Sequence, residues 1–343
     1  MISALATSWA LLLGMALLML GNGLQGTLLG VRANLEGFST TITGILMSGY
    51  FAGFLIGSVL APRLVQRVGH ARTFAALASL ASTAILAHSV FVEPITWVLM
   101  RLVSGFCYAG LYVVAESWLN EQATNETRGQ LLSIYMVVSL GGMGLGQILL
   151  NAADPAGSEL FILVSVLVSL ALLPMLLSVI PGPPIEVGGR RAGIRELLRA
   201  SPTGVIGMFM TLTAQGAFTG MGAVYAGRAG LDVREISFFM GVMVLGGVLL
   251  QWPIGRLSDR FDRRRVMTCV TLLAGLLAGS ATLVEPSSPL MLVLVGLYGG
   301  MAMPMYSLCI AYTNDYLNHD QMVEASGTLV LVAGLGASLG PVT

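Results

Sequence analysis

The sequence predicts an all-α polytopic membrane protein, and its composition and the length of its apolar runs are the main reasons. Hydrophobic residues make up 55% of the 343 residues, whereas charged residues make up only 10%. A soluble domain carries about 25% charged residues on average. Many apolar runs reach about 20 residues, the length of a helix that crosses the hydrocarbon core of a bilayer. The composition therefore excludes an ordinary soluble protein, and the zero net charge gives no sign of a nucleic-acid partner.

Polar, proline and glycine residues divide the chain into eleven candidate spans. In chain order, the spans cover residues 8–30, 39–61, 72–91, 95–119, 129–151, 158–180, 203–227, 234–256, 265–284, 289–313 and 322–343. No basic residue precedes the first span, and its apolar run is too long for a signal peptide, so we expect it to stay in the mature protein. The links between the spans leave no room for a soluble domain.

The arginines predict the orientation of the chain. All seventeen basic residues are arginines. With a cytoplasmic N-terminus, the inner links hold thirteen of them, namely Arg63, Arg67, Arg72, Arg128, Arg190, Arg191, Arg195, Arg199, Arg256, Arg260, Arg263, Arg264 and Arg265. The outer links then hold only Arg32, Arg228 and Arg234. Because cytoplasmic links are enriched in basic residues, we expect the N-terminus in the cytoplasm.

A single constant shift brings one half of the sequence onto the other. It aligns Gly49 with Gly247, Gly57 with Gly255 and Tyr108 with Tyr306. Two parallel six-helix repeats are a known plan of secondary transporters. We therefore predict an N-terminal half at 1–181, a cytoplasmic linker at 182–202 and a C-terminal half at 203–343. The same shift puts the counterpart of the sixth span beyond Thr343, so we expect eleven of twelve spans.

One inner link carries a motif rich in arginine, Gly255-Arg256-Leu257-Ser258-Asp259-Arg260-Phe261-Asp262-Arg263-Arg264-Arg265. It resembles the G-x-L-x-D-R-x-x-R-R signature of the major facilitator superfamily of membrane transporters. The resemblance implies the fold of that family and a gate, in which the glycine lets two helices approach while helix ends and arginines hold the aspartate. It assigns gating roles to Gly57, Gly255, Asp259, Arg260, Arg263 and Arg264. A plain positive-inside arginine link is the alternative.

The matching link in the first half departs from this pattern. Under the shift that aligns Gly57 with Gly255, Ala61 stands at the position of the aspartate and Pro62 at that of the arginine. This departure argues against a symmetric gate.

The exit of the fourth span gives a second resemblance. Glu121 and Arg128 have an E-x6-R spacing, similar to that of the sugar porters of the superfamily, where both residues join the inner charge network. The stretch 116–129 resembles the bacterial YcaD-like branch of the superfamily. The overall resemblance covers essentially the whole chain and adds Glu116, Glu121 and Arg128 to the expected gate.

The fourth span also carries an arginine inside an apolar run. Arg101 follows Trp97 by four residues, and we expect Trp97 to anchor this end of the helix at the membrane interface. Tyr108 and Tyr112 share a helical face with Arg101, which favours a water-filled cavity. The alternative is that Arg101 extends to the outer headgroups. Glu116 is our first candidate to carry a coupling proton, with a solvated carboxylate at the helix end as the alternative.

Polar side chains in other spans complete the expected substrate cavity. They are Asn22 and Gln25 in the first span, Gln215 and Tyr225 in the seventh, and Tyr298 and Tyr306 in the tenth. The alternative for these residues is hydrogen bonding between packed helices, which contributes only about 0.6 kcal/mol per contact on average.

These features predict secondary active or facilitative transport of a small organic solute by alternating access. Two alternatives stay open, an exporter of amphipathic compounds and a non-transporting receptor or scaffold that reuses the fold. The sequence has no nucleotide-binding loop, no catalytic cluster and no grouped metal ligands, so we expect no enzyme activity and no cofactor. We expect a monomer in the bacterial inner membrane whose partners are lipid, the solute and, as an option, a coupling proton.

Overall fold

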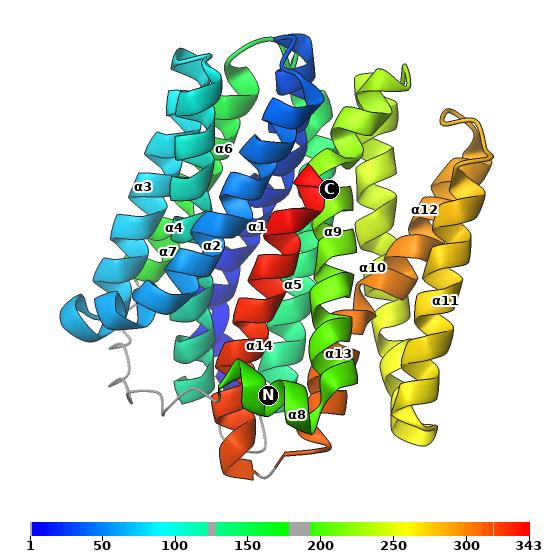
Figure 1. The fold of residues 1–343 in the computed structure, drawn as a ribbon. Coiled ribbons are helices and arrows are strands. Elements are labelled where there is room, and N and C mark those ends of the chain that lie inside the picture. The colour runs from blue at the N-terminus through cyan, green and yellow to red at the C-terminus, as the bar shows by residue number, and fades with distance from the viewer. Residues whose placement is uncertain (1, 123–127, 178–192, 318) are drawn as a thin grey trace. The chain divides into compact units, whose positions relative to one another are not determined.

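The computed structural model describes residues 2–122, 128–177, 193–317 and 319–343, and the described residues form helices and turns without strands (Figure 1). The chain divides into two compact units, Met1–Glu186 and Val187–Thr343, and the division lies inside the predicted linker. Among the described residues, eight helical segments are long and apolar enough to cross a membrane. The predicted all-α polytopic fold is confirmed.

Unit 1 contains α1 to α7, with one 3-10 turn. The elements are α1 (Ile2–Leu35), α2 (Thr40–Val68), α3 (His70–Val90), α4 (Pro94–Gln122), α5 (Arg128–Ile148), η1 (Leu149–Ala152), α6 (Glu159–Leu170) and α7 (Leu172–Leu177). Helix α4 packs against α2 and α3, while α1 packs against α5 and α6. Helix α6 also contacts α3, so it closes the side of the unit between α1 and α3.

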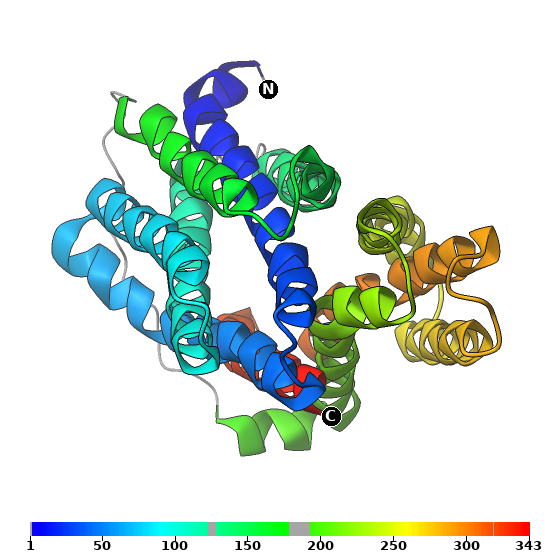
Figure 2. The same cartoon turned by 90° about the horizontal axis from the view of Figure 1, so that it is seen from above.

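Unit 2 contains α8 to α14. The elements are α8 (Ile194–Ala200), α9 (Pro202–Arg228), α10 (Val233–Arg260), α11 (Arg263–Ala281), α12 (Pro289–Ala302), α13 (Pro304–Asn314), α14 (His319–Leu339) and η2 (Gly340–Val342). Helix α12 packs against α10 and α11, and α9 packs against α13 and α14. Figure 1 and Figure 2 both show α11 and α12 side by side.

Each of the eleven predicted spans overlaps one helix or one pair of consecutive helices. The sixth span corresponds to α6 and α7, and the tenth to α12 and α13. The tenth span is interrupted at Met303, directly before Pro304. Proline has no N–H to continue the helical hydrogen bonds, and its ring crowds the preceding turn, so the interruption follows from the sequence.

The predicted alignment of the two halves is wrong in its register, because the packing inside the two units pairs different residues. Glycines allow close helix contact at matching places, so that an added Cβ would overlap the backbone of the facing helix. Three such contacts of unit 1 have a counterpart in unit 2. Gly23 meets Met143 as Gly216 meets Ala337, Gly53 meets Leu102 as Gly246 meets Gly296, and Gly105 meets Tyr50 as Gly299 meets Met243. The contacts thus pair Gly53 with Gly246, whereas the predicted shift places Gln251 opposite Gly53.

The physical reason for this error is the spacing of the glycines. The contacts shift α1 and α2 by 193 residues (Gly53 to Gly246) and α4 and α5 by 194 (Gly105 to Gly299), so both differ from the predicted shift of 198 (Gly49 to Gly247) by about one helical turn. A series of glycines at every fourth residue, such as Gly49, Gly53 and Gly57, produces glycine matches in both registers. Small residues at this spacing are a general feature of membrane helix contacts, so sequence matching alone does not separate the two registers.

The corrected register also changes the comparison of the two inner links. Residues 62–72 now match 255–265, so that Gln66 and Arg67 stand where the second half has Asp259 and Arg260. His70 begins α3 as Arg263 begins α11. The assignment of Ala61 and Pro62 to the positions of the aspartate and arginine is therefore wrong, and the first link keeps more of the motif than that assignment implied.

Candidate functional site

A polar cluster lies inside unit 1, where α1, α2 and α4 meet. We call it the Arg101 cluster, and it consists of Asn22, Met47, Tyr50, Arg101 and Tyr108. The guanidinium carbon of Arg101 lies 4.5 Å from the centre of the Tyr50 ring. The Tyr50 hydroxyl donates a hydrogen bond to Oδ1 of Asn22 at 3.3 Å. The rings of Tyr50 and Tyr108 are 6.2 Å apart. These residues from three helices therefore form one contiguous group.

Arg101 has a charge without a charged partner in the described part of the chain. Its side chain is 5% exposed. Nη2 lies 3.8 Å from Sδ of Met47, while Nε has no hydrogen-bond partner among the described residues. None of the ion pairs found between described residues involves Arg101. This burial inside the unit supports the cavity interpretation over extension to the headgroups.

Glycines bring α2 and α4 close enough to form the cluster. Gly53 faces the carbonyl of Leu102, and Gly105 faces the carbonyl of Tyr50. Each contact leaves no space for a side chain, so the two backbones touch directly. Arg101 lies one turn before Gly105 on α4 and is therefore held against the Tyr50 ring.

The sequence predicts that Trp97, near the start of α4, anchors this helix at the membrane interface. Trp97 is 0% exposed, so its assignment as an interfacial anchor is wrong. Its Nε1 donates to the carbonyls of His88 at 3.1 Å and Phe91 at 2.9 Å. The carbonyls at the C-terminal end of α3 need donors from outside their own helix, and Trp97 supplies one.

The remaining cavity candidates of unit 1 lie around the Arg101 cluster. Gln25 is buried and donates to Oγ of Ser104 at 3.4 Å, which joins α1 to α4. Tyr112 is half-buried, and its hydroxyl lies 2.8 Å from Sδ of Met19. This hydrogen bond to a neighbouring helix is the kind that the packing alternative predicts for Gln25.

Glu116 lies one turn beyond Tyr112 on α4. It is exposed and accepts a hydrogen bond from the hydroxyl of Tyr135 at 3.3 Å. Tyr135 is on α5, so the carboxylate lies between two helices of unit 1 and is accessible from outside the unit. This position suits a group that exchanges protons with water.

The cavity candidates of unit 2 do not gather at one point. Gln215, which matches Asn22 in the corrected register, donates to the carbonyl of Ala302 at 2.6 Å. That carbonyl lies at the interruption between α12 and α13, so Gln215 satisfies backbone at a broken helix. Tyr306 packs against the apolar core of unit 2.

Tyr225 and Tyr298 instead line an apolar cavity of about 470 Å³ between α9, α11 and α12. The ring of Phe218 stacks on Phe239 at 5.4 Å in the wall of this cavity. In unit 1 the matching face is covered, because Gly21 of α1 faces side chains of α6. Tyr225 and Tyr298 therefore belong to a site separate from Gln215.

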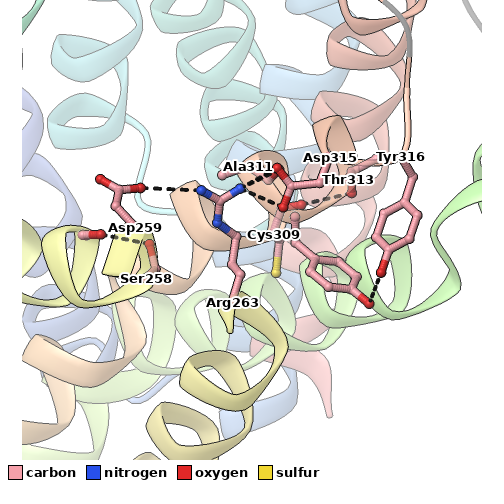
Figure 3. A network of polar contacts seen from close by, with 10 residues as sticks. Ser258, Asp259, Arg263, Cys309, Ala311, Thr313, Asp315 and Tyr316 are labelled. Carbon is pink, nitrogen blue, oxygen red and sulfur yellow. Dashed lines mark hydrogen bonds and ion pairs between the residues drawn. The ribbon is translucent and has the colours of Figure 1, made fainter. Parts of the chain in front are cut away.

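The signature motif forms a network at one end of unit 2, centred on Arg263 (Figure 3). Its Nη1 lies 2.7 Å from both carboxylate oxygens of Asp315 and 3.1 Å from the carbonyl of Ala311. Its Nη2 lies 3.3 Å from Oδ1 of Asp259. Arg263 thus joins the start of α11 to the ends of α10 and α13, where a cation is favoured by the helix dipole.

Sequence reasoning missed Asp315, the main partner of Arg263. The signal that identifies it is the corrected register, in which Asp315 matches Glu121, a residue already assigned to the gate. The motif residue Asp262 has another role, because its side chain accepts from the N–H of Arg265 and caps α11.

The other gating candidates fall into three groups. Gly57 is buried where α2 meets Phe106 of α4, whereas a Cβ at Gly255 would meet no described atom within 4 Å. Arg260 and Arg264 are exposed. The side chains of Glu121 and Arg128 lie outside the described part of the chain.

We expect the ion pair between Arg263 and Asp315 to contribute about 1 kcal/mol to the stability of unit 2. This is the upper end for accessible pairs, because the Arg263 side chain is mostly buried and contacts both oxygens. A double-mutant cycle with Arg263→Ala and Asp315→Ala measures the coupling by denaturation in mixed micelles. The same cycle with Arg265→Ala, an exposed neighbour, should show a coupling near zero. Equal coupling in the two cycles would contradict the assignment.

Neither a metal nor a disulfide site is found in the described residues. No group of three or more His, Cys, Asp or Glu side chains among them is placed to hold a metal ion. Cys107 and Cys309 are buried, Cys269 is exposed, and all three are free.

Comparison with known proteins gives a consistent family. A family model described as the Major Facilitator Superfamily matches residues 11–342. The uncharacterized MFS-type transporter YcaD of Escherichia fergusonii is 29% identical over 333 residues, which cover 96% of this chain and 86% of that protein. YcaD of Escherichia coli is also 29% identical, over 335 residues, with the same coverage.

Solved structures show the same fold. The nucleoside transporter NupG matches with a TM-score of 0.80 at 15% identity, over 98% of this chain and 89% of that chain. A bacterial homologue of the human lysosomal transporter Spinster, in an inward-facing and unoccupied conformation, matches with a TM-score of 0.78 at 17% identity, over 97% and 80% of the two chains. The D-xylose-proton symporter matches with a TM-score of 0.72 at 13% identity, over 98% and 90% of the two chains.

Proposed function

Because the chain belongs to the major facilitator superfamily, we propose that it is a secondary transporter that moves a small organic solute across the bacterial inner membrane. The observation that carries this proposal is the buried Arg101 cluster within membrane-spanning helices. Ionisable groups in such helices are rare and mark substrate or ion pathways. The distribution of arginines supports a cytoplasmic N-terminus.

Alternating access is the proposed mechanism. Each unit is tied together by glycine contacts between helix backbones, which favours movement of whole units over bending within them. We assign substrate contacts to Asn22, Tyr50 and Arg101. We assign the gate to the motif link, where Arg263 holds α10, α11 and α13 together.

Transport is tested in proteoliposomes by counterflow, which needs no coupling ion. The protein is reconstituted and loaded with unlabelled solute from a panel of organic acids, sugars and nucleosides, and the uptake of labelled solute is recorded. We expect exchange of at least one solute that is absent from protein-free liposomes. Folded, inserted protein that exchanges no member of the panel would count against the proposal.

The same preparation separates the two alternatives. An exporter of amphipathic compounds would move lipophilic cations or dyes and leave the small polar solutes unmoved. A receptor or scaffold would bind a solute in the purified state and show no flux.

If transport is driven by protons, we expect Glu116→Gln to abolish accumulation and preserve counterflow. A pH difference of one unit across the membrane supplies about 1.4 kcal/mol per proton, which is enough to accumulate a solute about tenfold. An amide in place of the carboxylate carries no proton, so the ratio of inner to outer solute should fall to about 1. Glu93→Gln, an exposed glutamate in the link before α4, is the matched control and should leave accumulation unchanged. Undiminished accumulation by Glu116→Gln would exclude Glu116 as the proton carrier.

A further inference from the structure

We propose that the Arg101 cluster binds a carboxylate of the transported solute, which makes the substrate an organic monoanion at this site. The proposal rests on the proposed transport function and adds the chemical class of the substrate. It depends on the unpaired charge of Arg101, on the donors beside it and on the difference between the two units.

The charge of Arg101 is the first argument. A buried guanidinium is costly unless a negative charge and hydrogen-bond acceptors compensate it. Its contacts in unit 1 are weak, namely the face of the Tyr50 ring and the sulfur of Met47. No described carboxylate forms an ion pair with it. A partner that arrives with the solute would supply the missing charge.

The unused donors beside Arg101 are the second argument. Nε of Arg101 and the hydroxyl of Tyr108 are both buried without a hydrogen-bond partner among the described residues. The guanidinium carbon of Arg101 lies 4.5 Å from the centre of the Tyr50 ring, and the Tyr108 ring centre lies 6.2 Å from the same ring. A guanidinium edge matches the two oxygens of a carboxylate, and a phenol adds a third donor. Asn22 and Tyr50 are only half-buried, so these two members of the cluster are accessible from outside the protein.

The difference between the units is the third argument. In the corrected register, Val295 matches Arg101, Met243 matches Tyr50 and Ala302 matches Tyr108. Unit 2 makes the same glycine contacts between its helices with apolar residues at these positions. The fold therefore does not require an arginine here, which argues that Arg101 serves a ligand and not the packing.

The single charge of the cluster selects the class of anion. One guanidinium balances one negative charge in a region of low dielectric constant, and a phosphate dianion would leave a second charge uncompensated. Apart from Arg72, the first residue of the third predicted span, Arg101 is the one arginine inside the predicted spans of the first half. A monocarboxylate fits this balance better than a phosphate ester.

The test measures thermal stabilisation of the purified protein by matched pairs of probes. Propionate and benzoate carry the carboxylate, propionamide and benzamide have nearly the same shape without the charge, and inorganic phosphate is the competing anion. Ligands that bind the folded state raise its melting temperature. We expect at least one carboxylate to stabilise the protein more than its amide and more than phosphate.

Variants connect this binding to the cluster. We expect Arg101→Met to remove the difference between carboxylate and amide, and Arg234→Met, an exposed arginine against the Phe238 ring, to preserve it. If Arg101→Met does not fold, Tyr108→Phe keeps the charge and removes one donor, and it should weaken carboxylate binding about tenfold. Equal stabilisation by acid and amide, or an undiminished preference in Arg101→Met or, where that variant does not fold, in Tyr108→Phe, would overturn the inference.

The outcome is distinguishable from a failure of the proposed function. Counterflow of a neutral solute without carboxylate binding would refute the anion site and leave transport standing. Carboxylate binding that depends on Arg101, in a protein that exchanges no solute, would refute transport and leave the site standing.

Discussion

Replacing Gly105 with alanine is expected to lower the free energy of unfolding of the protein by about 3 kcal/mol, near the upper end for overpacking. The added methyl group would overlap the carbonyl of Tyr50 and approach the backbone N of Phe54 to 2.9 Å. Both obstacles are backbone atoms, which cannot rotate away as a flexible side chain does. Helices α2 and α4 would have to separate, and the contacts around Gly53 would be lost with them.

Gly141→Ala is the matched control. Gly141 is also within a helix of unit 1, and an added Cβ there would meet no described atom within 4 Å. Alanine is favoured over glycine in a helix by about 1 kcal/mol, so this variant should be neutral or more stable. Denaturation in mixed micelles, followed by circular dichroism, compares the two. Equal stability of both variants would show that α2 and α4 are not in contact through Gly105.

The same substitution is expected to disturb the site. Gly105 and Arg101 lie one turn apart on α4, and both face Tyr50. A shift of α4 away from α2 would draw the guanidinium off the Tyr50 ring. Any folded fraction of Gly105→Ala should therefore have lost carboxylate binding. Wild-type binding in that fraction would show that the cluster does not depend on this contact.

The spans were predictable from the sequence because their signal is long and local. An apolar run of about 20 residues needs no information about its neighbours to be identified as a span. The interruption at Pro304 was equally local in cause. The register between the halves was not predictable in this way, because it depends on which glycine meets which backbone across two helices. Because glycines recur about once per helical turn, several alignments of the two halves match glycines equally well.

The site was predictable in part for the same reason. Arg101 stood out because a charge inside an apolar run is rare. Its contact with Tyr50 and the partnership of Arg263 with Asp315 join residues on different helices that are far apart in the sequence, which no local pattern predicts. Gln215 carried the same polar signal as Asn22, although it bonds to the backbone. Polar character within a span therefore identifies candidates, and only the packing separates solute contacts from helix contacts.

Replacing Trp97 with alanine is expected to lower the free energy of unfolding by about 4 kcal/mol. The indole is fully buried, its ring lies 5.2 Å from that of Phe38, and its N–H satisfies the carbonyls of His88 and Phe91. The substitution would leave both a cavity and buried carbonyls without a donor.

Trp252→Ala provides the contrast for this prediction. Trp252 is 68% exposed, and the contact described for its ring is the guanidinium of Arg256 at 5.2 Å. A tryptophan that anchors a helix at the membrane interface is exposed in this way, whereas a tryptophan that caps a neighbouring helix is not. The loss at Trp252 should be below about 1 kcal/mol, the range of exposed cation–π contacts. Similar losses of stability at the two positions would indicate that Trp97 lies at the interface, as its sequence position suggested. They would also show that its hydrogen bonds to His88 and Phe91 do not hold α3 against α4.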